Sequence, residues 1–380
     1  MLHLILGEVG SGKTVLLDQK ITAAVKGEVR SFLIVPEQST VSAERRMAES
    51  LPSFSPLVFE ATNFTRLADT FFRAEGGLSL RYADRTARHL AMWRALRELT
   101  PLLPEPPELD PPSLHRYLSA AAELTAGRVG SPELDAAAKS VPDERLSGRL
   151  RALSMILSAY RGILDEQFAD AENVLDVLAE RMQTSTFFYG TQFFFDNFTG
   201  FTEQQFAVIS ELLPVAEVTV TLPLPDDAEA SICYEEPEKT RLRLIAAAKR
   251  AGVPYDEIRL GRNRRTGSEL IRHLSSHFFN ADIEGNVSDL PADGSVRLVE
   301  ADDPYEAARF VSADILQKTA EEGALFRDFA ILSGDPELYR GILDVDLFRN
   351  GIPYFFSHRT DLSVLEPLKL VTSAYRVVTG

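Results

Sequence analysis

The sequence predicts an α/β protein in which helices cover a parallel β-sheet, with a helical insertion and the start of a second α/β domain. Three observations predict this fold. Apolar and helical segments alternate at the start of the chain, which is the order typical of strand–helix–strand units. Residues 80–185 show helical spacing of apolar side chains without a convincing strand. After residue 295 a new alternation of predicted strands and helices begins.

The first element is an apolar strand that leads into a glycine-rich loop. Residues 2–6 are followed by GEVGSGKT at positions 7–14, and a helix-like sequence follows at 15–20. This matches G-x-x-x-x-G-K-[ST] in the strand–loop–helix context that the motif requires. Glycines allow backbone N–H groups to surround a phosphate, and the helix N-terminus adds the positive end of its dipole. The predicted nucleotide-binding residues are Gly7, Gly10, Ser11, Gly12, Lys13 and Thr14.

The cofactors expected at this loop are ATP and Mg²⁺. Lys13 is expected to reach the β- and γ-phosphates, and the Thr14 hydroxyl is expected to ligate Mg²⁺. A second ligand for the metal is predicted at Asp196, which directly follows the apolar residues 193–195. A turn or helix cap is the alternative role for Asp196.

The residues after Asp196 predict a site that binds nucleotide better than it hydrolyses it. P-loop motors commonly place a Glu next, but here the residue is Asn197, and an amide cannot accept a proton from the attacking water. Glu203 lies further along, where Thr202 and Gln205 predict a helix N-terminus. We therefore favour helix capping over catalysis for this segment, and no catalytic residue is assigned.

The remaining elements follow from apolar spacing and from the positions of proline and glycine. The predicted strands are 31–35, 57–59, 187–189, 192–195 and 218–222. The predicted helices are 42–51, 64–74, 85–98, 113–126, 145–167, 203–213, 239–251 and 268–279. A proline-rich stretch at 101–112 is expected to be a rigid connector.

Changes of composition predict the domain boundaries. A phosphate-binding domain is expected at 1–75 and 186–290, interrupted by a helical insertion at 76–185. The Asp- and Gly-rich segment 281–295 is the predicted boundary with the second domain, 296–380. The elements expected there are strand 296–300, helix 304–319, strand 329–332 and helix 336–350. Because this domain looks unfinished at Gly380, we expect the chain to be a fragment.

Composition narrows the class of protein. With 45% hydrophobic and 25% charged residues, the chain is typical of soluble globular proteins, and no apolar run is long enough to span a membrane. The single cysteine, Cys233, excludes an internal disulfide framework, and we expect a cytoplasmic protein without a membrane partner. A net charge of −16 argues against tight DNA binding by this chain alone.

Several segments together resemble the B subunit of AddAB-type helicase–nucleases. They are the loop at 7–14, VPEQ at 35–38, AER at 43–45, NFTRLA at 63–68 and DNFTGFT at 196–202. The segments 306–309, 327–332 and 351–354 resemble the start of the second RecA-like domain of UvrD-type superfamily-one helicases. The resemblance implies that the predicted sheet domain is RecA-like. Asn197 stands where a Gly is common in the family.

The resemblance also implies a function. The sister A subunit of such complexes is the ATP-driven motor, and the B subunit helps to recognise a recombination hotspot and carries a C-terminal nuclease with an iron–sulphur cluster. We therefore expect a DNA-binding part of an ATP-dependent helicase–exonuclease complex that acts in double-strand-break repair and recombination. Neither the nuclease carboxylates nor the cluster cysteines can be placed here, so this chain alone is expected neither to unwind nor to cut DNA.

Two loops are candidates for DNA contact by the same resemblance. The residues are Pro36, Glu37, Gln38, Asn63, Thr65 and Arg66. A plain strand-to-helix turn explains the first three equally well, and capping by Thr62 or Asn63 explains part of the second set. For the basic run formed by Arg259, Arg262, Arg264 and Arg265, a solvated loop is favoured over a nucleic-acid or partner contact.

Two other classes of function stay open. One is a P-loop ATPase or kinase of another class, which would turn over ATP without regard to DNA. The other is a non-catalytic scaffold with a vestigial P-loop, for which the acidic surface is suited.

Overall fold

The computed structural model describes residues 1–51, 57–76, 83–103, 105, 107–165, 173–225, 232–261, 263–277, 290, 292–356 and 365–379. The chain divides into two compact units, Met1–Ser295 and Val296–Gly380. Most of the predicted boundary at 281–295 lies outside the described residues, as do Arg262 and the last residues of the helices predicted at 145–167 and 268–279. No helix within the described ranges is long and apolar enough to cross a membrane.

The first unit contains a six-stranded sheet in the order β3-β2-β4-β5-β1-β6. The strands are β1 (Leu2–Gly7), β2 (Ser31–Ile34), β3 (Phe59–Thr62), β4 (Gln192–Phe195), β5 (Glu217–Pro223) and β6 (Tyr255–Leu260). Every neighbouring pair is parallel, which confirms the predicted α/β class. Because β5 lies between β1 and β4, the glycine-rich loop and Asp196 follow strands that are separated by one strand.

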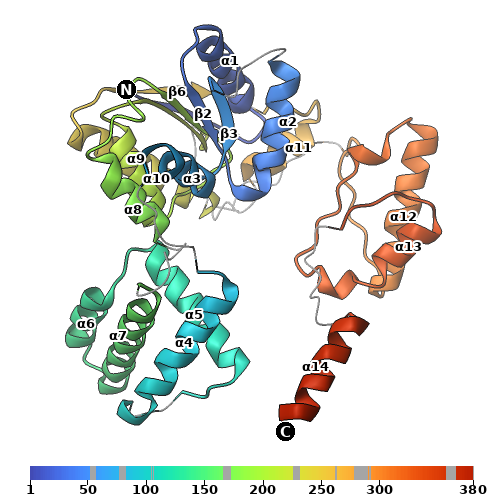
Figure 1. The fold of residues 1–380 in the computed structure, drawn as a ribbon. Helices are drawn as coiled ribbons and strands as arrows, with labels where there is room; N and C mark the ends of the chain where they lie inside the picture. Colours follow the sequence, from blue (N-terminus) through green and yellow to red (C-terminus); the bar gives the residue numbers. More distant parts are fainter. Residues whose placement is uncertain are drawn as a thin grey trace. The chain divides into compact units, whose positions relative to one another are not determined.

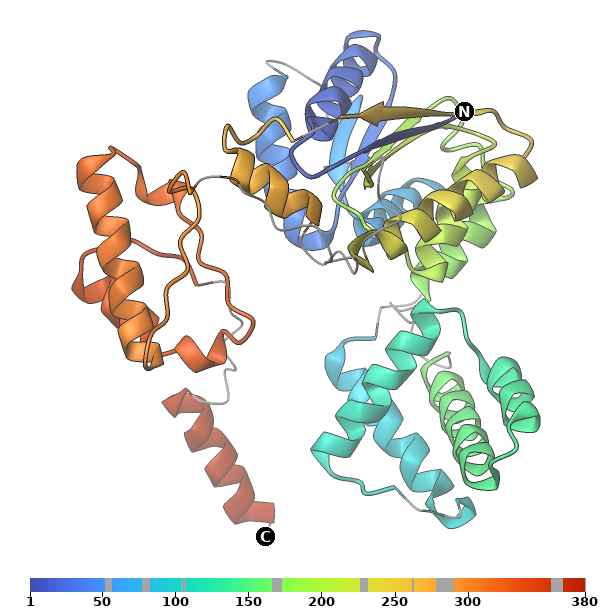
Figure 2. The ribbon, with the colours of Figure 1, turned by 180° about the vertical axis from the view of Figure 1, so that it is seen from behind.

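Helices cover both faces of this sheet (Figures 1 and 2). On one face, α1 (Lys13–Lys26) and α2 (Thr40–Ser50) share a buried cluster with Phe194 of β4. On the other face, Phe193 and Phe195 join a larger cluster, because successive strand side chains point to opposite faces. The helices of that cluster are α3 (Phe64–Glu75), α8 (Val174–Met182), α9 (Glu203–Leu212) and α10 (Glu235–Arg250). Burial on both faces is the usual state of a parallel sheet.

Between α3 and α8 the chain forms a group of helices with a core of its own. They are α4 (Arg85–Leu99), α5 (Pro111–Ala126), α6 (Ser131–Ser140) and α7 (Glu144–Asp165). Met92, Leu96 and Tyr160 are buried in that core. The three helices predicted in this region are confirmed, with small shifts at their ends, whereas α6 and α8 were not predicted. After α10 and β6, the helix α11 (Glu269–His277) is the last described helix of the first unit.

One predicted strand of the first unit is wrong. Residues 187–189 form a turn, in which the Thr191 hydroxyl donates to the carbonyl oxygen of Phe188 at 2.6 Å. Phe187 and Phe188 instead pack with Phe71, at ring-centroid distances of 5.6 Å for both pairs. The aromatic side chains that led to the predicted strand therefore belong to a turn and pack into the hydrophobic core.

The second unit contains α12 (Pro304–Glu321), α13 (Leu343–Arg349) and α14 (Glu366–Thr379). Ala308 and Ile315 of α12 pack against Leu343 and Leu347 of α13. The strands predicted at 296–300 and 329–332 are absent from this described part of the chain. A strand needs a hydrogen-bonded neighbour, and these two segments do not pair with each other. Asp303 caps α12 by accepting from the backbone N–H of Glu306 at 2.7 Å.

Candidate nucleotide-binding site

The glycine-rich loop joins β1 to α1 in the conformation that its glycines permit. Gly10 and Gly12 have φ angles of 85° and 100°, in the left-handed region where an L side chain is strained. Gly12 is the N-cap residue of α1, and no side chain caps this helix end. The first turn of α1 contains no acidic residue. The N–H groups and the positive dipole end of α1 are therefore available to an anion.

Lys13 folds back onto the loop. Its ammonium donates to the carbonyl oxygens of Gly7 and Glu8 at 2.8 and 2.7 Å. Burial lowers the pKa of Lys13 from 10.5 to about 8, against the opposing effect of the nearby carboxylates of Asp196 and Glu8. A bound phosphate would supply further negative charge and favour the protonated lysine.

Asp196 lies directly after β4 and is almost completely buried, at 2% exposure. Its Oδ1 accepts a hydrogen bond from the hydroxyl of Thr221 on β5 at 2.7 Å. Its Oδ2 accepts from Arg46 of α2 at 3.3 Å. The same guanidinium forms an ion pair with Asp18 of α1 at 3.2 Å. Burial raises the pKa of Asp18, while Arg46 opposes that rise.

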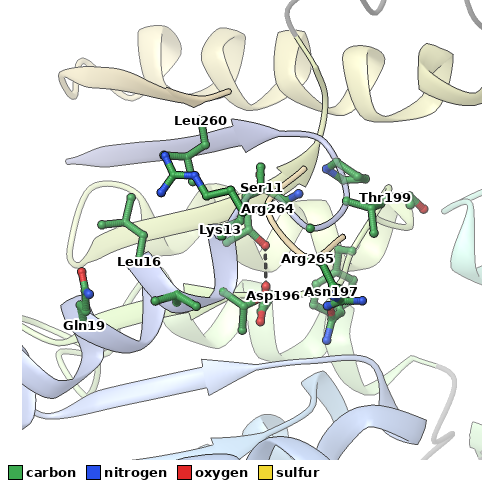
Figure 3. Close-up of a pocket in the computed structure, with 18 residues that line it drawn as sticks. Ser11, Lys13, Leu16, Gln19, Asp196, Asn197, Thr199, Leu260, Arg264 and Arg265 are labelled. Carbon is green, nitrogen blue, oxygen red and sulfur yellow. Dashed lines mark hydrogen bonds between the residues drawn. The ribbon is translucent and has the colours of Figure 1, made fainter. Parts of the chain in front are cut away.

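Lys13, Asp196 and Thr221 line a cavity of about 830 Å³. Lys13 and Asp196 lie near its centre, with Leu16 and Gln19 towards one side and Asn197 and Thr199 towards the other (Figure 3). A volume of this size is within the range of pockets that bind small molecules and cofactors. The other predicted loop residues that line the cavity are Gly10, Ser11, Gly12 and Thr14. Gly7 is the last residue of β1 and does not line it.

The residues present fit the phosphates of a nucleotide. The Ser11 hydroxyl is 1% exposed and has no hydrogen-bond partner in the part of the chain that the structure describes. A Cβ placed on Gly12 would meet no atom within 4 Å, so its backbone faces open space. An unsatisfied hydroxyl, a lysine and free helix N–H groups together are the donor set that phosphates require.

Two arginines that sequence reasoning placed in a solvated loop also line this cavity. Arg264 and Arg265 follow β6, and the backbone N–H of Arg264 donates to the carbonyl oxygen of Gly10 at 2.9 Å. The N–H of Asn263 donates to the Glu8 carboxylate at 3.3 Å. The high density of arginines in this segment was the signal available in the sequence. The contact between Asn263 and Glu8 joins residues about 255 positions apart, so the sequence alone did not show that the segment lies beside the glycine-rich loop.

Asn197 lies in a bend of the chain and has a positive φ angle, and Glu203 lies at the N-terminus of a helix. Asn197 has a φ of 64°, and Asn is among the few non-glycine residues that tolerate this region. The predicted helix cap is confirmed, because Thr202 accepts from the N–H of Gln205 at 3.2 Å and Gln205 accepts from Thr202 at 3.1 Å. Glu203 forms an ion pair with Arg243 at 2.7 Å and does not line the cavity.

The two candidate DNA-contacting segments follow neighbouring strands, β2 and β3. Pro36 precedes a short 3₁₀ turn (Glu37–Ser39), whose first two side chains, Glu37 and Gln38, are exposed. Asn63 caps α3 by accepting from the N–H of Arg66 at 2.9 Å. The predicted cap by Asn63 is thus confirmed.

The exposed side chains of this second segment differ in their partners. Thr65 and Arg66 lie in the first turn of α3, and both are exposed. The Arg66 guanidinium pairs with Glu44 of α2 at 3.3 Å. The structure therefore brings the two segments to the same edge of the sheet and links the helices that follow them.

Comparison with known proteins agrees with the motifs at this site. A family model described as "ADDB, N-terminal" matches residues 4–275. The chain is 24% identical over 388 residues to the B subunit of the ATP-dependent helicase/deoxyribonuclease of Thermoanaerobacter sp. (strain X514), covering 99% of this chain and 34% of that protein. The protein of the same name from Caldanaerobacter subterraneus subsp. tengcongensis is also 24% identical, over 99% of this chain and 33% of its own length. The protein of that name from Clostridium tetani is 24% identical over 95% of this chain and 32% of its own length.

The chain spans about a third of the length of the curated relatives that it matches. The family model covers well over half of the chain, including the glycine-rich loop, Asp196 and the arginines after β6. The chain therefore belongs to the AddB N-terminal family.

Proposed function

We propose that this chain binds ATP, with its phosphates in the glycine-rich loop and Mg²⁺ near Thr14 and Asp196. The observation that carries the proposal is the convergence of the uncapped N-terminus of α1, Lys13 and Ser11 on one cavity. Gly7 would allow the strand to enter the loop, and Gly10 and Gly12 would supply N–H groups to the phosphates. Ser11, whose N–H donates to the carbonyl oxygen of Glu8 at 3.1 Å, would complete the wall of the loop. Mg²⁺ would neutralise phosphate charge when bound.

We infer that hydrolysis at this site is weak or absent. The position after Asp196 holds an amide, and the next candidate base along the chain, Glu203, is held at a helix N-terminus by Arg243. A general base must lie within hydrogen-bond reach of the attacking water. ATP would then serve a structural or regulatory role rather than drive translocation.

We further propose that the chain is the N-terminal part of the B subunit of an ATP-dependent helicase/deoxyribonuclease that acts in double-strand-break repair and recombination. The relatives compared above bear that name and match this chain over 32–34% of their own length, which supports the proposal. The partner would be a motor subunit of the AddA type, in the cytoplasm. The nuclease and iron–sulphur cluster of such a protein are not part of the described residues.

DNA contact is proposed at the turn after β2 and the first turn of α3, through Pro36, Glu37, Gln38, Asn63, Thr65 and Arg66. The exposure of Gln38, Thr65 and Arg66 on one edge of the sheet supports this. Because Arg66 is already paired with Glu44, and Glu37 is acidic, contacts to bases or sugars are favoured over strong phosphate contacts.

The test is equilibrium binding of a fluorescent ATP analogue with Mg²⁺, together with phosphate release with and without single-stranded DNA. We expect binding with negligible turnover, and loss of binding in Lys13→Ala, which should remain folded by circular dichroism. Lys26→Ala, an exposed lysine at the other end of α1, is the matched control.

Each contrary result has its own meaning. Turnover that DNA does not affect would favour an ATPase or kinase of another class. Failure to bind any nucleotide would favour a scaffold with a vestigial loop. Binding that survives Lys13→Ala would show that the nucleotide lies elsewhere.

A further inference from the structure

Arg46 lies between two carboxylates at the nucleotide site. Its guanidinium is 3.2 Å from Asp18 of α1 and 3.3 Å from Asp196 after β4. The Arg46 and Asp18 side chains are 30% and 19% exposed, so the pairs are largely shielded from water. Charge–charge interactions in such surroundings are much stronger than in bulk water.

Asp196 has little remaining freedom to serve a metal ion. Thr221 donates to its Oδ1 at 2.7 Å, and Arg46 donates to its Oδ2. A divalent cation at Oδ2 would have to share that oxygen with a guanidinium and would meet its positive charge at short range. Arg46 already supplies the charge neutralisation that a metal would bring to this carboxylate.

Resting on the proposed nucleotide-binding function, we propose that Arg46 competes with the divalent cation for Asp196. It is a positioning residue that holds Asp196 and makes nucleotide binding largely independent of the metal. Asp18 sets the strength of this competition, because it draws the same guanidinium towards α1.

The neighbouring Arg45 offers a matched control on the same helix. Its side chain is 80% exposed and pairs with Glu49 one turn along α2 at 3.2 Å. Both arginines carry the same charge on adjacent residues, but only Arg46 reaches the cavity-lining Asp196. An effect seen at Arg46 and not at Arg45 therefore arises from the contact rather than from net charge.

The experiment measures the Mn²⁺ concentration that half-saturates the complex of this chain with a non-hydrolysable ATP analogue, by electron paramagnetic resonance. Arg46→Gln is expected to lower this concentration on the order of tenfold, which corresponds to about 1.4 kcal/mol. Arg46→Lys keeps the positive charge and is expected to stay near wild type. Arg45→Gln is expected to leave it unchanged.

A second variant tests the proposal without removing the Arg46 side chain. Asp18→Asn leaves Arg46 with Asp196 as its remaining ion-pair partner in the described part of the chain, so the half-saturating Mn²⁺ concentration should rise. Opposite shifts in Asp18→Asn and Arg46→Gln support the proposal. If Arg46→Gln fails to fold, a rise in Asp18→Asn still supports it, and no rise overturns it.

Failure of the competition and failure of the nucleotide site can be told apart. Analogue binding measured in EDTA tests the site alone, with Lys13→Ala as the negative control. If the wild type binds the analogue and both variants keep the wild-type Mn²⁺ response, Arg46 does not compete and this inference is wrong. If the wild type binds no analogue even with Mn²⁺ present, the proposed function itself is wrong, whereas binding that is lost only in EDTA overturns the metal independence inferred here.

Discussion

The backbone N–H of Arg264 donates a hydrogen bond to the carbonyl oxygen of Gly10 at 2.9 Å, which fastens the segment after β6 to the glycine-rich loop. The fit is close, because a Cβ on Gly10 would lie 2.3 Å from the Asn263 side-chain oxygen. That oxygen accepts from the N–H of Arg265 at 2.8 Å and so cannot move without losing a bond.

Gly10→Ala should therefore destabilise the first unit more than Gly12→Ala. Both glycines have positive φ angles, so both variants carry backbone strain of roughly 1–2 kcal/mol. Only Gly10→Ala adds a steric clash, which should cost about 1–3 kcal/mol more. The free energy of unfolding in urea measures the difference. Adding Asn263→Ala to Gly10→Ala should recover part of the loss, and equal values for the two glycine variants would contradict the close contact.

Nucleotide affinity should fall as the pH rises above about 8. The pKa of Lys13 is lowered to about 8 mainly by burial, and nearby phosphates favour its protonated form. The free protein must then take up a proton to bind, and the affinity should fall by up to about tenfold per pH unit. Titration calorimetry in buffers of different ionisation enthalpy at pH 8.5 should show proton uptake.

The stability of the ligand-free protein should follow the opposite trend. Between pH 8 and 10.5 the unfolded chain carries the proton on Lys13 and the folded chain does not, so this group's contribution to the unfolding free energy rises with pH. Lys26→Ala should leave both pH dependences unchanged. A flat affinity between pH 7.5 and 9.5 would show that Lys13 does not contact the phosphates.

The sequence predicted the glycine-rich loop and Asp196, but it did not predict that the segment after β6 lines the same cavity. The reasons are physical. The strand, loop and first helix are local in sequence and were found from one motif. Strand β6 was missed because Tyr255–Leu260 lies at the sheet edge and mixes Asp256, Glu257 and Arg259 with its apolar residues. Without that strand, nothing in the sequence places Arg264 and Arg265 beside a loop at the other end of the unit.

Aromatic and apolar segments were over-interpreted as strands. Phe187 and Phe188 are in a turn because their rings complete a cluster with Phe71, a tertiary contact that no local pattern reports. Leu298 and Leu332, in segments predicted as strands, are 100% and 95% exposed. Burial against a partner decides whether an apolar run becomes a strand, and periodicity does not contain that information.

Restoring an acidic residue after Asp196 should not create an efficient ATPase. Asn197 has a φ of 64°, so Asn197→Glu should lower the unfolding free energy by roughly 1–2 kcal/mol. Asn197→Gly, which tolerates this backbone, should be close to neutral. Urea unfolding and phosphate release measured on both variants test this. DNA-stimulated phosphate release by Asn197→Glu would show that the missing carboxylate was the only obstacle to turnover.

Asn63 allows helix capping and DNA contact to be separated. Its side chain accepts from the N–H of Arg66 at 2.9 Å, so Asn63→Ala should destabilise the first unit by about 1 kcal/mol. Asn63→Asp should keep the cap, because Asp is an equally good N-cap residue, and its charge suits the helix dipole. Thr65→Ala, at an exposed position of the same turn, is the control for stability.

The same variants then report on DNA. Asn63→Asp places a negative charge on the proposed DNA path, where it would repel the nucleic-acid backbone, so single-stranded DNA binding should weaken while stability is retained. Fluorescence anisotropy with a labelled oligonucleotide at two salt concentrations measures the loss. If Asn63→Asp binds DNA as the wild type does, and Asn63→Ala differs only in stability, Asn63 is a helix cap alone and its proposed DNA contact is wrong.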